Sequence, residues 1–308
     1  MARALVTGGA GFIGSNLVRA LLDRGDEVRV LDNFSTGNRA NLDGLEVEIA
    51  EGELRSYERV HNAVRGSEVV YHLGALGSVP RSVQDPLTSS AVNVEGTLNV
   101  LLAARDEGVR RVVFSSSSSV YGATRELPVQ ESLTADPISP YGVAKLAAER
   151  YCISFSRVYD SFESVVLRYF NVFGPRQSPF SQYAAMVPLF ITAIATGEPV
   201  IVFGDGEQSR DFTYIENVVD ATLRAAHAEG ANGRIFNVAA GSPASVNTVA
   251  ESIGRIVGKS VERTYAPPRP GDIRDSWADV SAARDVLGYA PSIDLEQGLR
   301  RTIEHLGF

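Results

Sequence analysis

The chain has 308 residues, of which 44% are hydrophobic and 21% charged, and its formal net charge is −8. This length exceeds the usual single core and favours two joined lobes, while the acidic balance argues against a nucleic-acid groove or an anionic membrane surface as partner. Cys152 is the only cysteine, which excludes an intramolecular disulfide framework and a cysteine-based metal cluster.

The sequence also bears on membrane binding and on cellular location. The sequence holds no apolar run of about 18 residues, the length typical of a membrane-spanning helix. The first residues lack a signal-peptide layout and enter a strand directly at Ala4. We therefore expect a cytoplasmic enzyme that does not bind membranes.

Residues 3–32 are predicted to form a strand–turn–helix–strand unit. The apolar residues 4–7 indicate a strand, residues 16–24 a helix ended by Gly25, and residues 27–31 a second strand that finishes at Asp32. In the turn between them, Gly8, Gly11 and Gly14 allow backbone N–H groups to approach a pyrophosphate. Asp32 would accept hydrogen bonds from a ribose and repel a 2′-phosphate, so the pattern favours NAD over NADP.

The alternation of strands and helices then continues. Residues 46–50 and 68–73 are predicted strands, residues 56–65 a helix, and residues 87–107 one long helix. His72 falls inside a strand pattern and is interpreted as a packed core histidine. The other histidines are scattered on helices, so no metal site is predicted; they are His61, His227 and His305.

The stretch from Phe114 to Lys145 carries the strongest signal for catalysis. An apolar run at 111–114 passes into hydroxyls at 115–119, which is typical of a buried strand that ends at a site. Tyr141 and Lys145 lie one turn apart on a predicted helix and share a face. Such a pair is also common on solvated helix faces, and serine runs usually mark loops, so the combination with the glycine-rich turn is what favours a site.

A phenol needs help to act as a base near neutral pH. Its pKa must fall from about 10 to about 7, which requires about 4 kcal/mol of preferential stabilisation of the phenolate. A nearby lysine ammonium in a partly desolvated site can supply this, and a serine hydroxyl can hold the substrate oxygen.

Together these motifs resemble the extended short-chain dehydrogenase/reductase superfamily, specifically its nucleotide-sugar 4-epimerases of the UDP-galactose 4-epimerase type. The resemblance covers essentially the whole chain. It rests on the segment Thr7 to Gly14, Asp32 with Asn33, Ser117 with Tyr121 and Gly122, and Tyr141 with Lys145.

The resemblance implies a catalytic set of Ser117, Tyr141 and Lys145, an NAD cofactor and no metal. Position 53 departs from the family, which usually has Asp there near the adenine. The implied NAD-binding residues are Gly8, Gly11, Phe12, Ile13, Asp32, Asn33, Ser35, Gly37, Glu53, Leu54, Leu73, Gly74, Ala75, Asn93, Ser115, Tyr141, Lys145 and Phe170, with Phe170 beside the nicotinamide.

The implied substrate is a UDP-sugar. Arg210 and Arg269 match the family's diphosphate clamp, Asp272 its ribose contact, and Val187 and Phe203 its uridine-binding walls. Two arginines after Gly- or Pro-rich turns also suit a diphosphate chemically. The implied substrate-binding residues are Ser78, Ser117, Ser118, Ser119, Tyr141, Asn171, Val187, Phe203, Arg210, Arg269, Asp272 and Ser276.

The implied reaction inverts C4 of a hexose through a 4-keto intermediate. Tyr141 as phenolate takes the proton of the 4-hydroxyl, hydride moves to NAD, and the ketone turns its other face before hydride returns. Relatives that eliminate water or carbon dioxide carry an acidic residue just after the matching hydroxyl. Ser118 and Ser119 stand there in this chain, which favours an epimerase over a dehydratase or decarboxylase.

Segments 75–82 and 174–185 resemble the branch that accepts UDP-N-acetylglucosamine, and Ser276 leaves room for an N-acetyl group. We therefore expect UDP-N-acetylglucosamine and/or UDP-glucose as substrate. UDP-glucuronic acid is the alternative, because the hydroxyls at 117–119 could line a carboxylate; Ser178 stands where uronic-acid epimerases often have arginine. A non-catalytic NAD-binding protein is a further alternative, although such proteins commonly lose the Tyr or Lys kept here.

The expected fold is α/β, with a doubly wound parallel Rossmann sheet and a smaller α/β substrate lobe. We expect residues 1–168 to form the NAD-binding domain, with 210–240 returning to it. Residues 169–209 and 241–308 are expected to form the nucleotide-sugar lobe. The resemblance also implies a homodimer that pairs helices 91–107 and 141–158 of each subunit.

Overall fold

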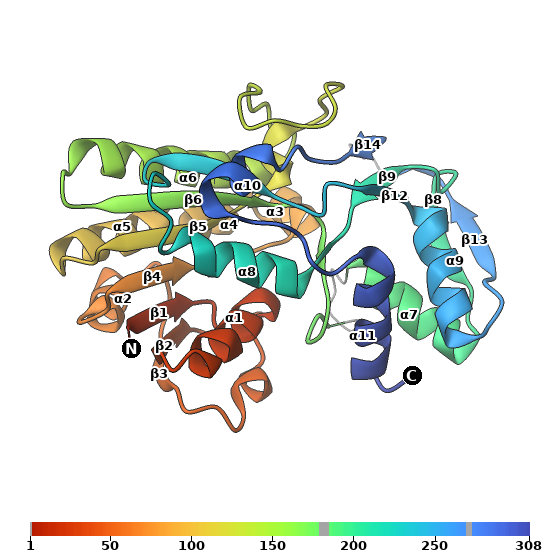
Figure 1. The fold of residues 1–308 in the computed structure, drawn as a ribbon, viewed down its shortest axis with the longest axis horizontal. Helices are drawn as coiled ribbons and strands as arrows, with labels where there is room; N and C mark the ends of the chain where they lie inside the picture. Colours follow the sequence, from red (N-terminus) through yellow and green to blue (C-terminus); the bar gives the residue numbers. More distant parts are fainter. Residues whose placement is uncertain (1, 179–184, 269–272) are drawn as a thin grey trace.

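The computed structural model describes residues 2–178, 185–268 and 273–308. Its centre is a seven-stranded parallel sheet with the order β11-β6-β5-β4-β1-β2-β3 (Figure 1). This confirms the predicted doubly wound α/β fold. The strands are β1 (Arg3–Thr7), β2 (Glu27–Asp32), β3 (Glu48–Glu51), β4 (Val69–His72), β5 (Arg111–Ser117), β6 (Glu163–Tyr169) and β11 (Arg234–Val238).

Helices cover both faces of this sheet. On one face α1 (Phe12–Asp23) and α8 (Ile215–Ala225) pack on a core that includes Val6 and Tyr71. On the other face α2 (Tyr57–Val64), α5 (Gly96–Asp106) and α6 (Pro140–Val158) pack on a core that includes Leu5 and Val70. Successive strand residues point to opposite faces, so strands buried on both faces are apolar throughout, as parallel strands are.

The predicted helix 87–107 corresponds to an unbroken helical stretch over residues 86–106, in which one turn is π-helical. The structure has α3 (Val79–Gln84), which was not predicted, then α4 (Pro86–Ser90), a π-helical turn (Ala91–Glu95) and α5. Side-chain caps mark the starts of α3 and α4: Ser78 accepts a hydrogen bond from the N–H of Arg81, and Asp85 accepts one from the N–H of Thr88. A proline follows shortly after each cap, where a helix tolerates it.

The remaining elements lie largely to one side of the large sheet, at the right of Figure 1. β11 pairs with β6, so part of the 210–240 segment does return to the first sheet. The exact domain boundaries stay a prediction. The elements are β7 (Val172–Phe173), α7 (Met186–Thr196), β8 (Val200–Phe203), β9 (Ser209–Asp211), β10 (Thr213–Tyr214), β12 (Pro243–Ser245), α9 (Val246–Val257), β13 (Arg263–Ala266), β14 (Asp275–Ser276), α10 (Ser281–Leu287) and α11 (Leu295–His305), with 3₁₀ turns at Arg39–Leu42 and Ser118–Tyr121.

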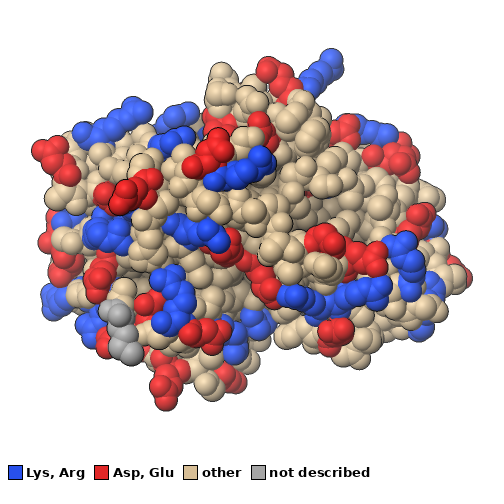
Figure 2. Space-filling model, in the orientation of Figure 1, with Lys and Arg blue, Asp and Glu red and all other residues tan. Residues whose placement is uncertain are grey.

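Two further findings concern the described residues as a whole. Every helix within them is too short or too polar to cross a bilayer. Within the same ranges, no three His, Cys, Asp or Glu side chains are grouped so that they could hold a metal. On the face that Figure 2 shows, Lys and Arg side chains are interspersed with Asp and Glu.

A buried ion pair fastens α6 to the centre of the sheet. Glu149 on α6 and Arg168 on β6 have side chains 0% and 1% exposed, and two hydrogen bonds of 2.9 and 2.7 Å join them. The hydroxyl of Ser116 donates to the same carboxylate at 2.5 Å. The Arg168 guanidinium also lies 4.5 Å from the centroid of the Tyr121 ring. One carboxylate therefore connects α6, β5 and β6.

Removing one partner of this pair should cost more than removing both. Glu149→Gln leaves Arg168 as a buried charge without a counter-ion, and we expect the free energy of unfolding to fall by about 3–5 kcal/mol. The double variant Glu149→Gln/Arg168→Met removes both charges and should recover much of that loss. Urea titrations followed by circular dichroism measure both values. Equal losses in the single and double variants would contradict this account.

Candidate active site

The carboxyl ends of β1, β2, β4 and β5 open onto one cavity of about 740 Å³. Ligands of open parallel sheets bind at this edge. Most of the predicted cofactor residues line the cavity, together with Ser78 from the predicted substrate set. Those lining residues are Gly8, Gly11, Phe12, Ile13, Asp32, Asn33, Ser35, Gly37, Glu53, Leu54, Leu73, Gly74, Ala75 and Ser115.

The backbone of the glycine-rich turn leaves no space for a side chain at Gly8 or Gly14. A Cβ on Gly14 would lie 2.1 Å from the carbonyl oxygen of Gly8, and one on Gly8 would lie 2.7 Å from the Cα of Gly74. Gly8 also has a φ of +69°, which glycine adopts without strain. α1 begins immediately after Gly11 with no side-chain cap, so its first N–H groups face the cavity and suit an anion.

Asp32 closes β2 at the same edge. Its two carboxylate oxygens accept hydrogen bonds from the N–H groups of Ala10 at 2.9 Å and Phe34 at 2.8 Å, and the residue is 8% exposed. Gly37 passes so close that a Cβ there would lie 3.1 Å from the carboxylate. The remaining lone pairs of Asp32 can accept ribose hydroxyls. Glu53 lines the cavity and forms a 2.6 Å ion pair with Arg55.

These observations fit a dinucleotide. The glycines leave space for a pyrophosphate at the start of α1, Asp32 provides acceptors for a ribose, and its charge disfavours a 2′-phosphate. Asn93 does not line the cavity. Its side-chain amide instead accepts from the N–H of Leu76 at 2.8 Å and donates to the carbonyl of Leu76 at 3.1 Å. Asn93 therefore fixes the backbone of Leu76, which does line the cavity.

The predicted catalytic residues meet at the end of β5. Tyr141 lies beside Ser117, whose side chain acts to lower the Tyr141 pKa, and the Ser117 hydroxyl donates to that of Ser119 at 3.1 Å. Lys145 is 3% exposed and its amine donates to the carbonyl oxygen of Ser115 at 2.7 Å. The start of α6 is fixed by Ser139, which caps the N–H of Gly142 at 3.1 Å.

Tyr141 is also held through its backbone. Its N–H donates to the hydroxyl of Ser82 on α3 at 3.0 Å. Gly142 beside it approaches the chain so closely that a Cβ would lie 2.6 Å from the carbonyl oxygen of Ser119. The first turn of α6 is therefore pressed against the end of β5, which brings Tyr141 to Ser117.

The electrostatics differ from the prediction made for the phenol. Burial raises the pKa of Tyr141, and only the hydrogen bond from Ser117 opposes this. Burial lowers the pKa of Lys145 to about 8, while Cys152 and Glu149 act in the opposite direction. The Lys145 ammonium is not among the groups that lower the Tyr141 pKa here, and its amine donates to the Ser115 carbonyl.

The predicted nucleotide-sugar residues lie around the smaller sheets. Arg210 on β9 is the register partner of Ser276 on β14, and its Nη1 donates to the carbonyl of Ser209 at 2.8 Å. Asn171 is exposed and its amide donates to the carbonyl of the neighbouring Asp211 at 3.3 Å. Arg269 and Asp272 lie outside the described residues. Ser118 and Ser119 form the 3₁₀ turn that follows Ser117.

Two predicted contacts are not supported by the placement of their side chains. Phe170 is 0% exposed and packs 6.2 Å from Tyr121, ring centroid to ring centroid, so its ring does not line the cavity. Val187 on α7 is 3% exposed and belongs to the main core. Both residues belong to apolar segments, and packing of the core decides which side chains of such a segment point inward.

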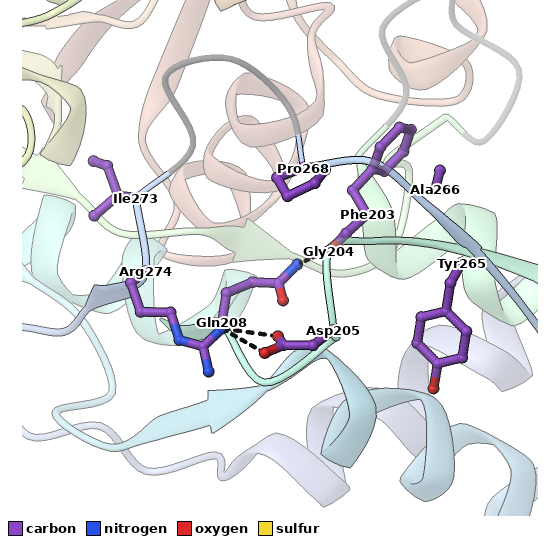
Figure 3. A pocket seen from close by; sticks show the side chains of 9 residues that line it. All are labelled: Phe203, Gly204, Asp205, Gln208, Tyr265, Ala266, Pro268, Ile273 and Arg274. Carbon is purple, nitrogen blue, oxygen red and sulfur yellow. Dashed lines mark hydrogen bonds and ion pairs between the residues drawn. The ribbon is translucent and has the colours of Figure 1, made fainter.

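Phe203 lines a second cavity of about 830 Å³, shown in Figure 3. Gln208 donates to the carbonyl oxygen of Phe203 at 2.7 Å, and Arg274 forms bonds of 2.8 and 2.9 Å to both carboxylate oxygens of Asp205. Sequence reasoning did not select Gln208 or Arg274. In the first cavity it also missed Arg81 and Arg176, although Arg176 follows the Gly174–Pro175 turn and so resembles the arginines that were selected.

Known proteins similar to this chain in sequence and in structure include epimerases. The family model described as the NAD dependent epimerase/dehydratase family matches residues 4–239. A UDP-glucose 4-epimerase of Mycolicibacterium smegmatis is 39% identical over 98% of this chain and 97% of its own length.

Two solved structures superpose on nearly the whole chain. One is a UDP-glucose 4-epimerase of Thermotoga maritima with UDP-glucose, at a TM-score of 0.94 and 38% identity, covering 99% of this chain and 98% of that one. The other is a UDP-N-acetylglucosamine 4-epimerase of Methanobrevibacter ruminantium in complex with UDP-N-acetylmuramic acid, also at a TM-score of 0.94, 38% identity and coverages of 99% and 98%.

The buried Lys145 predicts a pH-dependent stability. An unfolded lysine keeps its proton up to about pH 10.4, whereas Lys145 in the folded protein loses it near its pKa of about 8. Between these values the unfolded state binds the extra proton, so this group makes the free energy of unfolding rise with pH.

Urea unfolding at several pH values between about 8 and 10.4 measures this rise. We expect it to be smaller in Lys145→Met than in the wild-type protein. Lys259→Met, which removes an exposed lysine, is the matched control and should keep the wild-type slope. Parallel curves for the wild type and Lys145→Met would show that Lys145 does not carry this effect.

Proposed function

This chain belongs to the NAD-dependent epimerase/dehydratase family, and on that premise we propose that it inverts C4 of a UDP-hexose. The observation that carries the proposal is the group at the end of β5, where Tyr141 lies beside Ser117 and the Lys145 amine donates to the Ser115 carbonyl. These groups adjoin the cavity whose glycine turn and Asp32 suit a dinucleotide.

The chemistry divides between cofactor and protein. Bound NAD supplies the acceptor, and later the donor, of a hydride. The chain's own task is to move one proton: the Oη of Tyr141 takes it from the sugar 4-hydroxyl and returns it at the end of the cycle. The Ser117 hydroxyl lies beside Tyr141 and can share a substrate oxygen with it, which would hold that oxygen in line for the transfer.

The residues after Ser117 support epimerisation over elimination. Ser118 and Ser119 occupy the 3₁₀ turn at the end of β5, and Ser119 shares a hydrogen bond of 3.1 Å with Ser117. Hydroxyls at these positions cannot supply a carboxyl acid or base, so a ketone formed at C4 would be reduced again and not carried into loss of water.

We propose UDP-N-acetylglucosamine and/or UDP-glucose as the substrate. Ser276 is a small residue placed directly beside Arg210, the residue assigned to the diphosphate, so space near the sugar would accommodate an N-acetyl group. The similar enzymes include a UDP-glucose and a UDP-N-acetylglucosamine 4-epimerase and also a UDP-glucuronate 4-epimerase, so their names are compatible with this proposal and with the second candidate. UDP-glucuronic acid remains the second candidate.

We further propose that the protein acts as a homodimer through the outer faces of α5 and α6. Apolar side chains there are exposed: Val143 is 54% exposed and Tyr151 is 40% exposed, two turns apart on α6. On α5, Leu98 and Leu102 are half-buried and one turn apart. A matching face on a second copy would bury both stripes. The division of the chain into lobes at 168, 209 and 240 and a cytoplasmic location stay predictions.

Substrate conversion tests the proposed function. Purified protein without added NAD is incubated separately with UDP-glucose, UDP-N-acetylglucosamine and UDP-glucuronic acid, and the anomeric proton signals are followed by NMR. We expect the 4-epimer from at least one of the first two. Conversion of UDP-glucuronic acid alone would select the second candidate. No epimer from any substrate, even after NAD is supplied, would refute the proposal.

Tyr141→Phe provides the matched inactive variant. Loss of the proton acceptor should lower kcat by about 10²–10⁴-fold. Tyr159→Phe, at the far end of the same helix, controls for removal of a tyrosine hydroxyl and should keep wild-type activity. Similar rates for the two variants would remove Tyr141 from its assigned role.

The dimer is tested by charging its proposed face. Val143→Glu combined with Tyr151→Glu places two carboxylates in that face, and we expect it to sediment as a monomer at concentrations where the wild type is a dimer. Ile201→Glu alters an equally exposed apolar residue on β8 and should leave the dimer intact. Wild-type protein that sediments as a monomer would refute the proposed interface.

A further inference from the structure

Arg176 is held rigidly at the wall of the cofactor cavity. It follows β7 and lines the same cavity as Gly11, Phe12 and Ile13. Its φ is +69°, in the left-handed region that side chains other than glycine rarely adopt. Such a conformation persists only where the surroundings determine it, and residues of this kind cluster at ligand sites.

Hydrogen bonds tie Arg176 to the first turn of α1. Its Nη2 donates to the amide oxygen of Asn16. The amide nitrogen of Asn16 in turn donates to the carbonyl of Phe12 at 2.9 Å and to that of Pro175 at 3.1 Å. The guanidinium therefore lies beside the N-terminal turn of α1, on the side from which the segment after β7 approaches.

The charge of Arg176 has no anionic partner within the described part of the chain. Neither Arg176 nor Arg19 forms an ion pair there, and the Nε of each is buried without a hydrogen-bond partner. Burial lowers the pKa of Arg176 first, and Arg19 lowers it further. The same two arginines help to lower the pKa of His305 on α11, so three basic groups converge on this place.

The carboxylates at the cavity are already engaged. Asp32 accepts two backbone N–H groups, Glu53 pairs with Arg55, and Asp85 caps α4. A partly buried cation that lacks a counter-charge is costly unless a ligand brings one. The nearest feature built for an anion is the start of α1.

We propose that Arg176 binds the diphosphate of NAD, opposite the N–H groups of the glycine-rich turn. A guanidinium can bond two phosphate oxygens at once, which suits a diphosphate held between a helix N-terminus and an arginine. Arg176 would then retain the cofactor through the ketone stage of the reaction. The inference rests on the proposed function in that it needs NAD as the resident cofactor.

The test measures cofactor binding directly. Arg176→Gln removes the charge, and Arg19→Gln removes a neighbouring charge that does not line the cavity. The NAD that co-purifies is released and quantified, and the Kd for NAD is then measured by calorimetry on protein freed of cofactor. We expect Arg176→Gln to raise the Kd by about 10- to 100-fold and Arg19→Gln to raise it by less than about 3-fold.

Thermal unfolding separates a binding role from a structural one. In protein freed of NAD, Arg176→Gln removes repulsion from Arg19, so its Tm should equal or exceed that of the wild type, while the increase in Tm on adding NAD should shrink. A lower Tm without NAD together with a wild-type increase on adding NAD would overturn the inference.

Two other results would also overturn it, and they are distinguishable. A raised KM for the UDP-sugar with an unchanged Kd for NAD would assign Arg176 to the substrate and leave the proposed function intact. Wild-type protein that binds no NAD at all would overturn this inference together with the proposed function.

Discussion

The arrangement of the active site depends on one buried carboxylate. Glu149 binds Arg168 of β6 and the hydroxyl of Ser116 in β5, so a single side chain of α6 holds that helix against two neighbouring strands. Tyr141, Lys145 and Glu149 follow one another at intervals of one turn, and fixing the last fixes the face on which the other two lie. This is why Lys145 reaches the carbonyl of Ser115 and Tyr141 reaches Ser117. Because the pair is buried, its geometry is restricted to the arrangement that satisfies both charges.

A second constraint acts at the cofactor cavity, where a protein of net negative charge must bind an anion. With a net charge of −8 the chain offers no general attraction for phosphate. The features that suit an anion are instead local: the N-terminus of α1, which has no side-chain cap, the close approach allowed by Gly8 and Gly14, and, in our proposal, the partly buried Arg176 beside Asn16. The buried Asp32, by contrast, stands where a ribose would lie. Groups of opposite charge thus line the same cavity.

Prediction from sequence succeeded where a local pattern has one physical meaning. The strands of the first half, the glycine turn and the Asp that closes β2 were predicted and are present. It failed where packing chooses between alternatives. The segment 87–107 reads as one regular helix, yet it contains a π-helical turn, and the short α3 before it, which Ser78 caps, was not predicted. Phe170 follows an apolar strand, and the core takes its ring completely, which a strand pattern cannot reveal. Lys145 shares a face with Tyr141 as expected, but its amine bonds the Ser115 carbonyl, whose position is set by the neighbouring strand.

The sequence by itself determined the fold class and the cofactor class, and it predicted the catalytic side chains. These depend on periodicity, on glycines that no other residue can replace, and on chemistry carried by single side chains. Only the tertiary structure decided which groups meet. Arg176 lies 160 positions from Asn16 in the chain and gains its place beside α1 through the fold alone. Glu149 and Arg168 likewise attract each other strongly only in the folded protein, because burial removes the water that would screen their charges. Contacts between distant segments, and the loss of solvent that gives them strength, are properties of the folded chain.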